Sequence, residues 1–245
     1  MSPEILFYLL LFVVAFLYAS IGHGGASGYL ALMALFNFAP DVMKPSALLL
    51  NLFVSFIAFI QYYRGGHFSW KIFLPLAAAS IPFAFLGGLL KIDPFLYKKI
   101  LGILLLIPAV RFMFQKNNAE VEIDKQHTGI SLIMGGSIGF LSGLIGIGGG
   151  IILSPLLLLL KWCNIKKIAG VSALFIFVNS LSGLAGQFSK GIHFSGDISV
   201  FVGVAFLGGI IGSYLGSMKF NASVLKYLLS LTLLMASFKL LFAAA

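Results

Sequence analysis

The sequence has few charged residues for its length. Only 9% of its 245 residues are Asp, Glu, Lys or Arg, and 60% are hydrophobic. Soluble globular domains carry about 25% charged and roughly 45–50% apolar residues. Seven acids and sixteen bases are too few to cover a soluble fold of this size. The composition therefore predicts a protein whose surface is covered by the lipid bilayer.

The chain also lacks groups on which many chemical sites depend. Cys163 is the single cysteine, which excludes a disulfide framework, a CxxC redox pair and a Cys-ligated metal site. The bases form no cluster, so the formal net charge of +9 indicates positive-inside anchoring and no nucleic-acid partner. An intramembrane enzyme needs a nucleophile–base pair, a metal cluster or paired acids within a span. We therefore expect no cofactor, no metal and no enzymatic activity.

Long apolar stretches fill most of the sequence. A helix of about 20 residues spans a bilayer, and nothing alternates with the period of two that strands require. The predicted fold class is an all-α polytopic membrane protein. The stretches cover residues 5–36, 46–63, 72–90, 95–114, 129–160, 168–188, 196–218 and 222–243.

The two halves of the chain match each other. The segment from Gln61 to Ser69 shares Gln, a base, Gly, His, Phe and Ser in register with the segment from Gln187 to Ser195. Such agreement predicts two homologous four-segment repeats, over residues 1–114 and 128–245, joined by a hydrophilic linker at 115–127. Internal repeats that enclose a central site are common in secondary transporters.

The first segment of each half is broken by glycines. A helix over residues 5–36 would be about 48 Å long, against a hydrocarbon core of about 30 Å. The breaks are Gly22–Gly25 and Gly146–Gly150. If each break crosses straight through, the chain has eight spans. If each break instead turns its segment back as a re-entrant hairpin, the two halves have inverted orientations. Lys and Arg then divide more unevenly between the two faces of the membrane. We favour the second arrangement, with the N-terminus outside and residues 115–127 in the cytoplasm.

The breaks predict an anion site. Unwound glycines expose N–H groups, and each following half-helix adds its positive dipole end; alternatively, the glycines are close helix contacts. His23 could donate to an anion, carry a proton, or bond a freed carbonyl of the loop. Ser172 could instead cap its helix, and the amides could bond across helices. The predicted substrate-binding residues are Ser20, Gly22, His23, Gly24, Gly25, Ser27, Asn51, Gly146, Gly148, Gly149, Gly150, Ser172, Asn179 and Gln187.

These motifs resemble a known family. Gly22-His23-Gly24-Gly25, the run Gly146–Gly150 with Pro155 behind it, and the matched Gly65–Trp70 and Gly191–Ser195 segments are similar to the sulfite exporter TauE/SafE-like transporters, the TSUP group. The resemblance covers essentially the whole chain. It implies a duplicated transporter of the bacterial inner membrane for a small sulfur-containing anion, such as sulfite, thiosulfate, sulfate or an organosulfonate. We expect alternating access, with H⁺ or Na⁺ as the coupling ion. A passive anion channel is the alternative, and an intramembrane enzyme is a weaker one.

Overall fold

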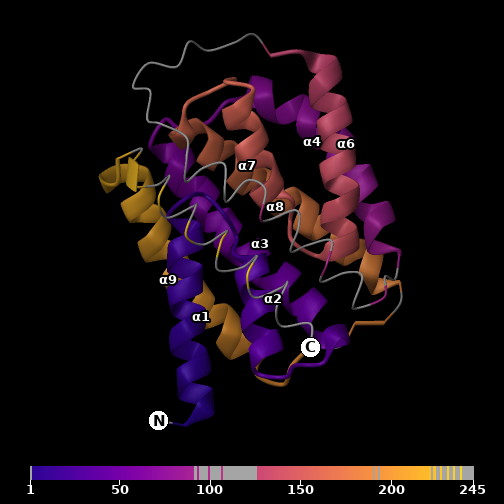
Figure 1. The fold of residues 1–245 in the computed structure, drawn as a ribbon, viewed down its shortest axis with the longest axis vertical. Coiled ribbons are helices and arrows are strands. Elements are labelled where there is room, and N and C mark those ends of the chain that lie inside the picture. Colours follow the sequence, from indigo (N-terminus) through magenta and orange to yellow (C-terminus); the bar gives the residue numbers. More distant parts are fainter. Residues whose placement is uncertain are drawn as a thin grey trace.

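The structure is a computed structural model, which describes residues 2–90 and 126–221 except positions 190 and 193, with isolated positions beyond these ranges. Most of the predicted segments 95–114 and 222–243, and nearly all of the linker, lie outside the described residues. The described part is helical and contains no strand (Figure 1). Its helices are α1 (Pro3–Ala19), α2 (Ala26–Leu35), α3 (Pro40–Arg64), α4 (Trp70–Gly88), α6 (Thr128–Ile145), α7 (Gly150–Leu159), α8 (Ile165–Phe188) and α9 (Ile198–Tyr214), which continues into the π-helix η1 (Leu215–Lys219).

Five of these helices are long and apolar enough to cross a membrane. They are α3, α4, α6, α8 and α9 with its π-helical extension. Helices α1 and α7 are apolar but shorter, with 17 and 10 residues. The prediction of an all-α polytopic membrane protein is thus confirmed.

The first break turns the chain back on itself. The first break comprises residues 20–25, between α1 and α2. Beside it, the Tyr18 hydroxyl lies 2.9 Å from Ser27 Oγ. At the far end of the same pair, the Phe7 ring lies 5.2 Å from that of Phe36 and 5.4 Å from that of Phe38. Helix α2 therefore runs antiparallel to α1, and the two form a helical hairpin, as the favoured re-entrant arrangement requires.

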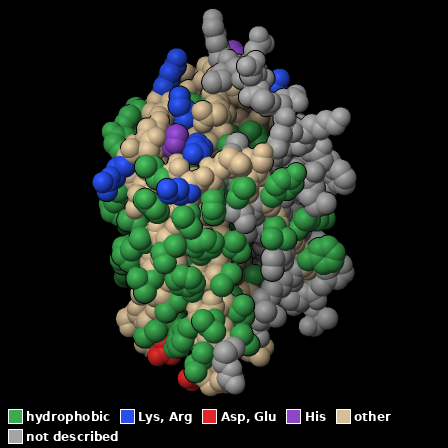
Figure 2. All heavy atoms as spheres, turned by 90° about the vertical axis from the view of Figure 1, so that its left-hand side faces the viewer, with side chains coloured by type: hydrophobic (Ala, Val, Ile, Leu, Met, Phe, Trp, Pro, Cys, Tyr) green, Lys and Arg blue, Asp and Glu red, His purple; other side chains and the backbone are tan. Residues whose placement is uncertain are grey.

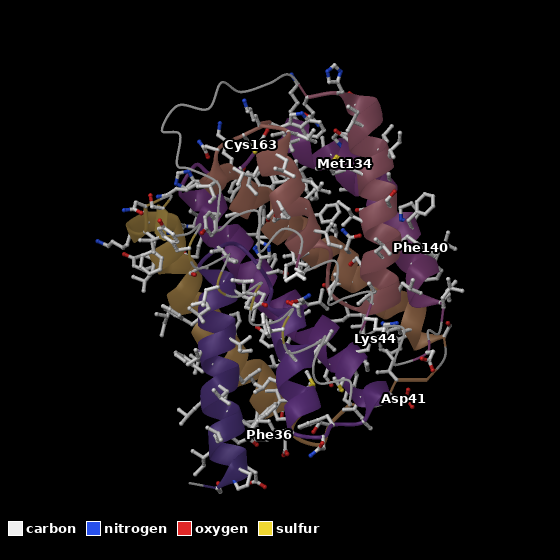
Figure 3. All side chains as sticks on the ribbon, viewed as in Figure 1. Phe36, Asp41, Lys44, Met134, Phe140 and Cys163 are labelled. Carbon is white, nitrogen blue, oxygen red and sulfur yellow. The ribbon has the colours of Figure 1, made fainter. Side chains whose placement is uncertain are left out.

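The second break does the same from the other end of the molecule. The helix is interrupted at residues 146–149, between α6 and α7, and Gly150, the last residue of the predicted break, begins α7. Ile138 of α6 shares one apolar cluster with Leu153 and Leu157 of α7. Met134, near the start of α6, and Cys163, just after α7, lie toward the same end of the molecule (Figure 3). Figure 1 shows that α1 and α6 begin at opposite ends, so the two hairpins enter from opposite sides.

The helix contacts in one half of the chain have counterparts in the other half. Helix α4 packs on α6 as α9 packs on α1, α4 on α8 as α9 on α3, and α7 on α8 as α2 on α3. Helices α3 and α8 lie together at the centre. This arrangement is the one expected of inverted repeats. The homology of the halves and the boundaries at 114 and 128 stay predictions.

Two glycine stripes allow the hairpins to pack closely. A Cβ on each of these glycines would meet the backbone of the neighbouring helix, so the helices approach as in small-xxx-small contacts. The stripes are Gly135, Gly139 and Gly143 of α6, on Leu76, Ser80 and Ala84 of α4, and Gly208, Gly212 and Gly216 of α9 and η1, on Phe12, Phe16 and Ser20 of the first hairpin.

Charged side chains separate toward the two ends of the molecule. Figure 2 shows Lys and Arg gathered toward one end and acids at the other. The basic end carries Arg64 and Lys71 around the α3–α4 turn, Lys161, Lys166 and Lys167 around the α7–α8 turn, and Lys219. Glu4, Asp41 and Asp197 begin α1, α3 and α9 at the acidic end. The described residues thus have the asymmetry that the positive-inside rule associates with a fixed orientation.

Candidate functional site

The two breaks meet at the side chain of Asn51, in α3. Its Oδ1 accepts a hydrogen bond from the backbone N–H of Ala26, the first residue of α2 after the first break, at 3.0 Å. Its Nδ2 donates to the carbonyl of Ile147 in the second break and to Ser180 Oγ in α8, both at 3.3 Å. Asn51 is completely buried. The amide therefore ties both hairpins and both central helices together, so it acts as the cross-helix bond that was one alternative for it.

Ile176 of α8 is the apolar neighbour that the two breaks share. A Cβ on Gly24 would lie 3.1 Å from Ile176 Cγ2, and one on Gly148 2.7 Å from the same atom. A Cβ on Gly150 would meet Ile176 Cδ1. The N-termini of α2 and α7 thus converge on one point, from helices that lead to opposite ends of the molecule. This places two positive helix ends together.

His23 links the first break to the second hairpin. Its Nδ1 lies 3.0 Å from the carbonyl of Ile21, and because a carbonyl only accepts, Nδ1 carries the proton. Its Nε2 lies 3.3 Å from Ser154 Oγ in α7, and Ser154 Oγ lies 2.8 Å from Ser172 Oγ in α8. The bond to a freed loop carbonyl is therefore present. A role of His23 with the anion or with a proton stays a prediction.

Several of the predicted glycines are required by the backbone itself. Gly22, Gly25, Gly146, Gly148 and Gly149 all have φ between +74° and +98°, a region that glycine enters without strain. Gly22 also lies against the backbone of Ala169 in α8. At the tip of the first hairpin, Gly22 therefore both interrupts the helix and makes a close contact with a neighbouring helix.

The hydroxyl groups of the predicted serines are hydrogen-bonded to nearby groups. Ser20 Oγ donates to the carbonyl of Leu17 at 2.7 Å, and Ser27 pairs with Tyr18. Ser172 does not cap its helix, because α8 begins earlier, at Ile165, where Asn164 Oδ1 accepts from the N–H of Lys167 at 2.9 Å. The capping alternative for Ser172 is wrong.

The two remaining predicted amides make no described hydrogen bond with the breaks. Asn179 Nδ2 donates to Ser80 Oγ at 3.1 Å and to the carbonyl of Phe175 at 2.8 Å, so this amide faces α4. Gln187 lies in the last turn of α8, and its Nε2 has no hydrogen-bond partner.

The structure also places beside the breaks residues that were not predicted from the sequence. Ser180 was not predicted as a binding residue, although a serine within an apolar helix is a usable signal. Ile176 carries no such signal, since an isoleucine in an apolar helix looks like any lipid-facing or core residue.

The region around the breaks is enclosed. Every residue from 18 to 33 and from 145 to 151 is buried. The convergence of α2 and α7 is therefore shielded from both ends of the molecule in this conformation.

Comparison with known proteins identifies the family of this chain. The family model of the sulfite exporter TauE/SafE matches residues 7–240. The chain belongs to the TauE/SafE family. This confirms the resemblance drawn from the glycine motifs.

Named relatives of this TauE/SafE protein cover most of its length. The probable membrane transporter protein y4hK of Sinorhizobium fredii is 36% identical over 236 residues, 94% of this chain and 95% of the relative. A probable membrane transporter protein of Methanocaldococcus jannaschii is 33% identical, over 71% of this chain and 68% of its own length. The probable membrane transporter protein YdhB of Bacillus subtilis is 27% identical, over 97% and 100%. No solved structure matches the chain.

Proposed function

We propose that this TauE/SafE protein is a secondary transporter that moves a small sulfur-containing anion across the bacterial inner membrane. The candidate substrates are sulfite, thiosulfate, sulfate and organosulfonates, driven by an H⁺ or Na⁺ gradient. The observation that carries the proposal is the convergence of the α2 and α7 N-termini on Asn51 and Ile176.

The chemistry of this point suits an anion. Two half-helix N-termini supply N–H donors and two partial positive charges, together about one elementary charge. The polar side chains hydrogen-bonded beside the breaks include those of Asn51, Ser154 and Ser180, none of which carries a charge. Partial charges attract an oxyanion without the strong ion pair that would retain it, which suits a site that must also release its ligand.

The arrangement of the hairpins supports alternating access. Helix α2 leads from the breaks to the end where α1 begins, and α7 leads to the end where α6 begins. Movement of one hairpin would open the shared point to one face, and movement of the other would open it to the opposite face. Asn51 would then hold the closed arrangement, because it bonds both breaks.

The buried breaks favour a transporter over the passive anion channel. A channel requires an open path past its selective point, whereas residues 18–33 and 145–151 are all buried. A transporter passes through such an enclosed state in every cycle.

Two measurements on the purified protein test the proposal. Thermal-shift screening against sulfite, thiosulfate, sulfate, taurine and sulfoacetate should show stabilisation by at least one of them, with chloride as control. Reconstituted protein should then exchange that labelled anion across a liposome membrane with saturable kinetics and accelerated counterflow. Absence of stabilisation and of exchange for all five would contradict the proposal, and unsaturable flux without counterflow would favour the channel.

A further inference from the structure

Lys44 is an exception to the separation of charge. Among the bases within residues 2–90 and 126–221, the other described ones lie at the basic end. Lys44 stands in the second turn of α3, close after Asp41 and at the acidic end (Figure 3). Positive-inside anchoring therefore does not account for a lysine here.

The side chain of Lys44 lies along the tip of the second hairpin. Lys44 is half-buried. A Cβ on Gly146 would lie 2.7 Å from Lys44 Cγ, 3.7 Å from Cδ and 3.6 Å from Cε. The aliphatic stem therefore lies against the glycine at which α6 ends.

The register between α3 and α8 brings Gln187 opposite Lys44. The two helices are antiparallel: Asn51 bonds Ser180, and further along, Leu48 Cδ1 lies 3.8 Å from the Cβ position of Gly183. Residues four apart share a helix face. One turn beyond the Leu48–Gly183 contact, Lys44 and Gln187 therefore face each other.

Gln187 has a donor without an acceptor at this place. Its side chain is only 9% exposed, and its Nε2 has no hydrogen-bond partner. Buried polar groups are almost always paired, so an unpaired N–H₂ group marks a position where a ligand acceptor fits. An ammonium and an amide donor on facing helices make a site for an oxyanion.

The first hairpin lacks this arrangement in the described residues. Its tip glycine, Gly22, lies against the backbone of Ala169, whereas Gly146 lies against a lysine side chain. The immediate neighbours of the two tip glycines therefore differ.

We propose that Lys44 and Gln187 form an outer anion site, which captures the sulfur-containing anion at the acidic end before it reaches the breaks. This inference rests on the proposed function, since it concerns the same substrate. The Lys44 ammonium raises the local concentration of the anion, and Gln187 Nε2 donates to one of its oxygens. Because the Lys44 stem lies on Gly146, capture takes place at the hairpin tip itself.

The test compares transport from the two faces. Labelled sulfite and thiosulfate are presented separately to right-side-out and inverted membrane vesicles that contain wild type, Lys44→Gln, Lys44→Arg or Gln187→Leu. Lys71→Gln, a base at the opposite end, is the matched control. Lys44→Gln and Gln187→Leu should raise KM by about 5–10-fold for anion presented from the acidic end only, as loss of a steering charge or a donor implies. Lys44→Arg should retain most of the wild-type affinity.

The outcomes separate the two proposals. An unchanged KM in Lys44→Gln, or equal changes from both faces, overturns the outer site while the transport function stands. If wild type carries neither anion, the proposed function fails for them, and direct binding of labelled thiosulfate to the purified protein decides the outer site: binding lost in Lys44→Gln and kept in Lys71→Gln supports it, and any other pattern overturns it. Melting temperatures near that of wild type exclude misfolding as the cause.

Discussion

The side-chain amide of Asn51 donates a hydrogen bond to the backbone carbonyl of Ile147, 96 residues further along the chain, at 3.3 Å. The same amide accepts from the N–H of Ala26. One side chain therefore bonds both hairpins, and its three described bonds use its oxygen and its two N–H groups. Any movement of one hairpin away from α3 must break at least one of these bonds.

Replacement of Asn51 should weaken the attachment of both hairpins to α3 and so lower the stability of the protein. Asn51→Ala leaves the Ala26 N–H and the Ile147 carbonyl without their partner, and each such buried group costs about 1–3 kcal/mol. We expect a lower melting temperature and loss of transport. Asn51→Asp should be similarly impaired, because a carboxylate cannot donate to Ile147. Ser180→Ala removes one bond only, and should be milder; equal effects of Ser180→Ala and Asn51→Ala would contradict this role.

The link from His23 to Ser154 can be separated from the bond that His23 makes within its own loop. His23→Asn keeps a donor near the position of Nδ1 and so can bond the Ile21 carbonyl, but it is too short to reach Ser154. We expect His23→Asn to melt near the wild-type temperature and to transport several-fold more slowly. His23→Ala loses both bonds, and should be slower and less stable. Transport by His23→Asn at the wild-type rate would leave only the loop bond as the role of His23.

The glycine stripes can be tested with controls on the same helices. Gly139→Val and Gly212→Val each place a side chain against a neighbouring backbone, and overpacking of this kind costs about 1–3 kcal/mol or more. Gly129 and Gly203 lie on the same two helices with nothing within 4 Å of an added Cβ. Gly129→Val and Gly203→Val should therefore keep the wild-type melting temperature. Similar losses in all four variants would argue against close packing of α4 on α6 and of α1 on α9.

Cys163 should be chemically silent in the folded protein. Its side chain is buried, and burial raises the pKa of the Cys163 thiol to about 12. Because the thiolate is the reactive form, a maleimide at pH 7.5 should not modify the native protein, but should modify it fully in denaturant. Lys161→Cys, exposed in the same turn, should be labelled rapidly. Rapid labelling of wild type would show that Cys163 is accessible.

Much of this fold could be predicted from the sequence, because its main features follow from local chemistry. Consecutive glycines within an apolar segment too long for one crossing indicated the two breaks, and both breaks lie where the glycines stand. The first residue of a helix was predicted less accurately. The apolar stretch suggested that α8 begins at residue 168, but Asn164 caps it earlier, because a helix can extend past the apolar core.

The partners across the site could not be predicted in the same way. Which face of α8 meets the breaks depends on how α3 and α8 pack, and no periodic pattern in this mostly apolar helix indicates that face. Asn51 and Ser172 were selected from the sequence as substrate-binding residues. Both lie beside the breaks, and their binding of substrate stays a prediction. Asn179, which faces α4, was also selected, and Ser180 one residue later was missed.

The central claim is that the two breaks together form one substrate site. Binding of the labelled sulfur anion that stabilises the wild type tests it most directly, with Gly24→Ala in the first break and Gly148→Ala in the second. A Cβ on either glycine would meet the Asn51 side chain. Gly66→Ala and Gly191→Ala are the controls, because these turn glycines have φ of +75° and +76°, close to the +77° of Gly148, with nothing within 4 Å of an added Cβ. The account predicts that each break variant loses binding by about tenfold or more, as a clash or strain of over about 1.4 kcal/mol would give, while both controls bind as wild type. Wild-type binding by either break variant would contradict it.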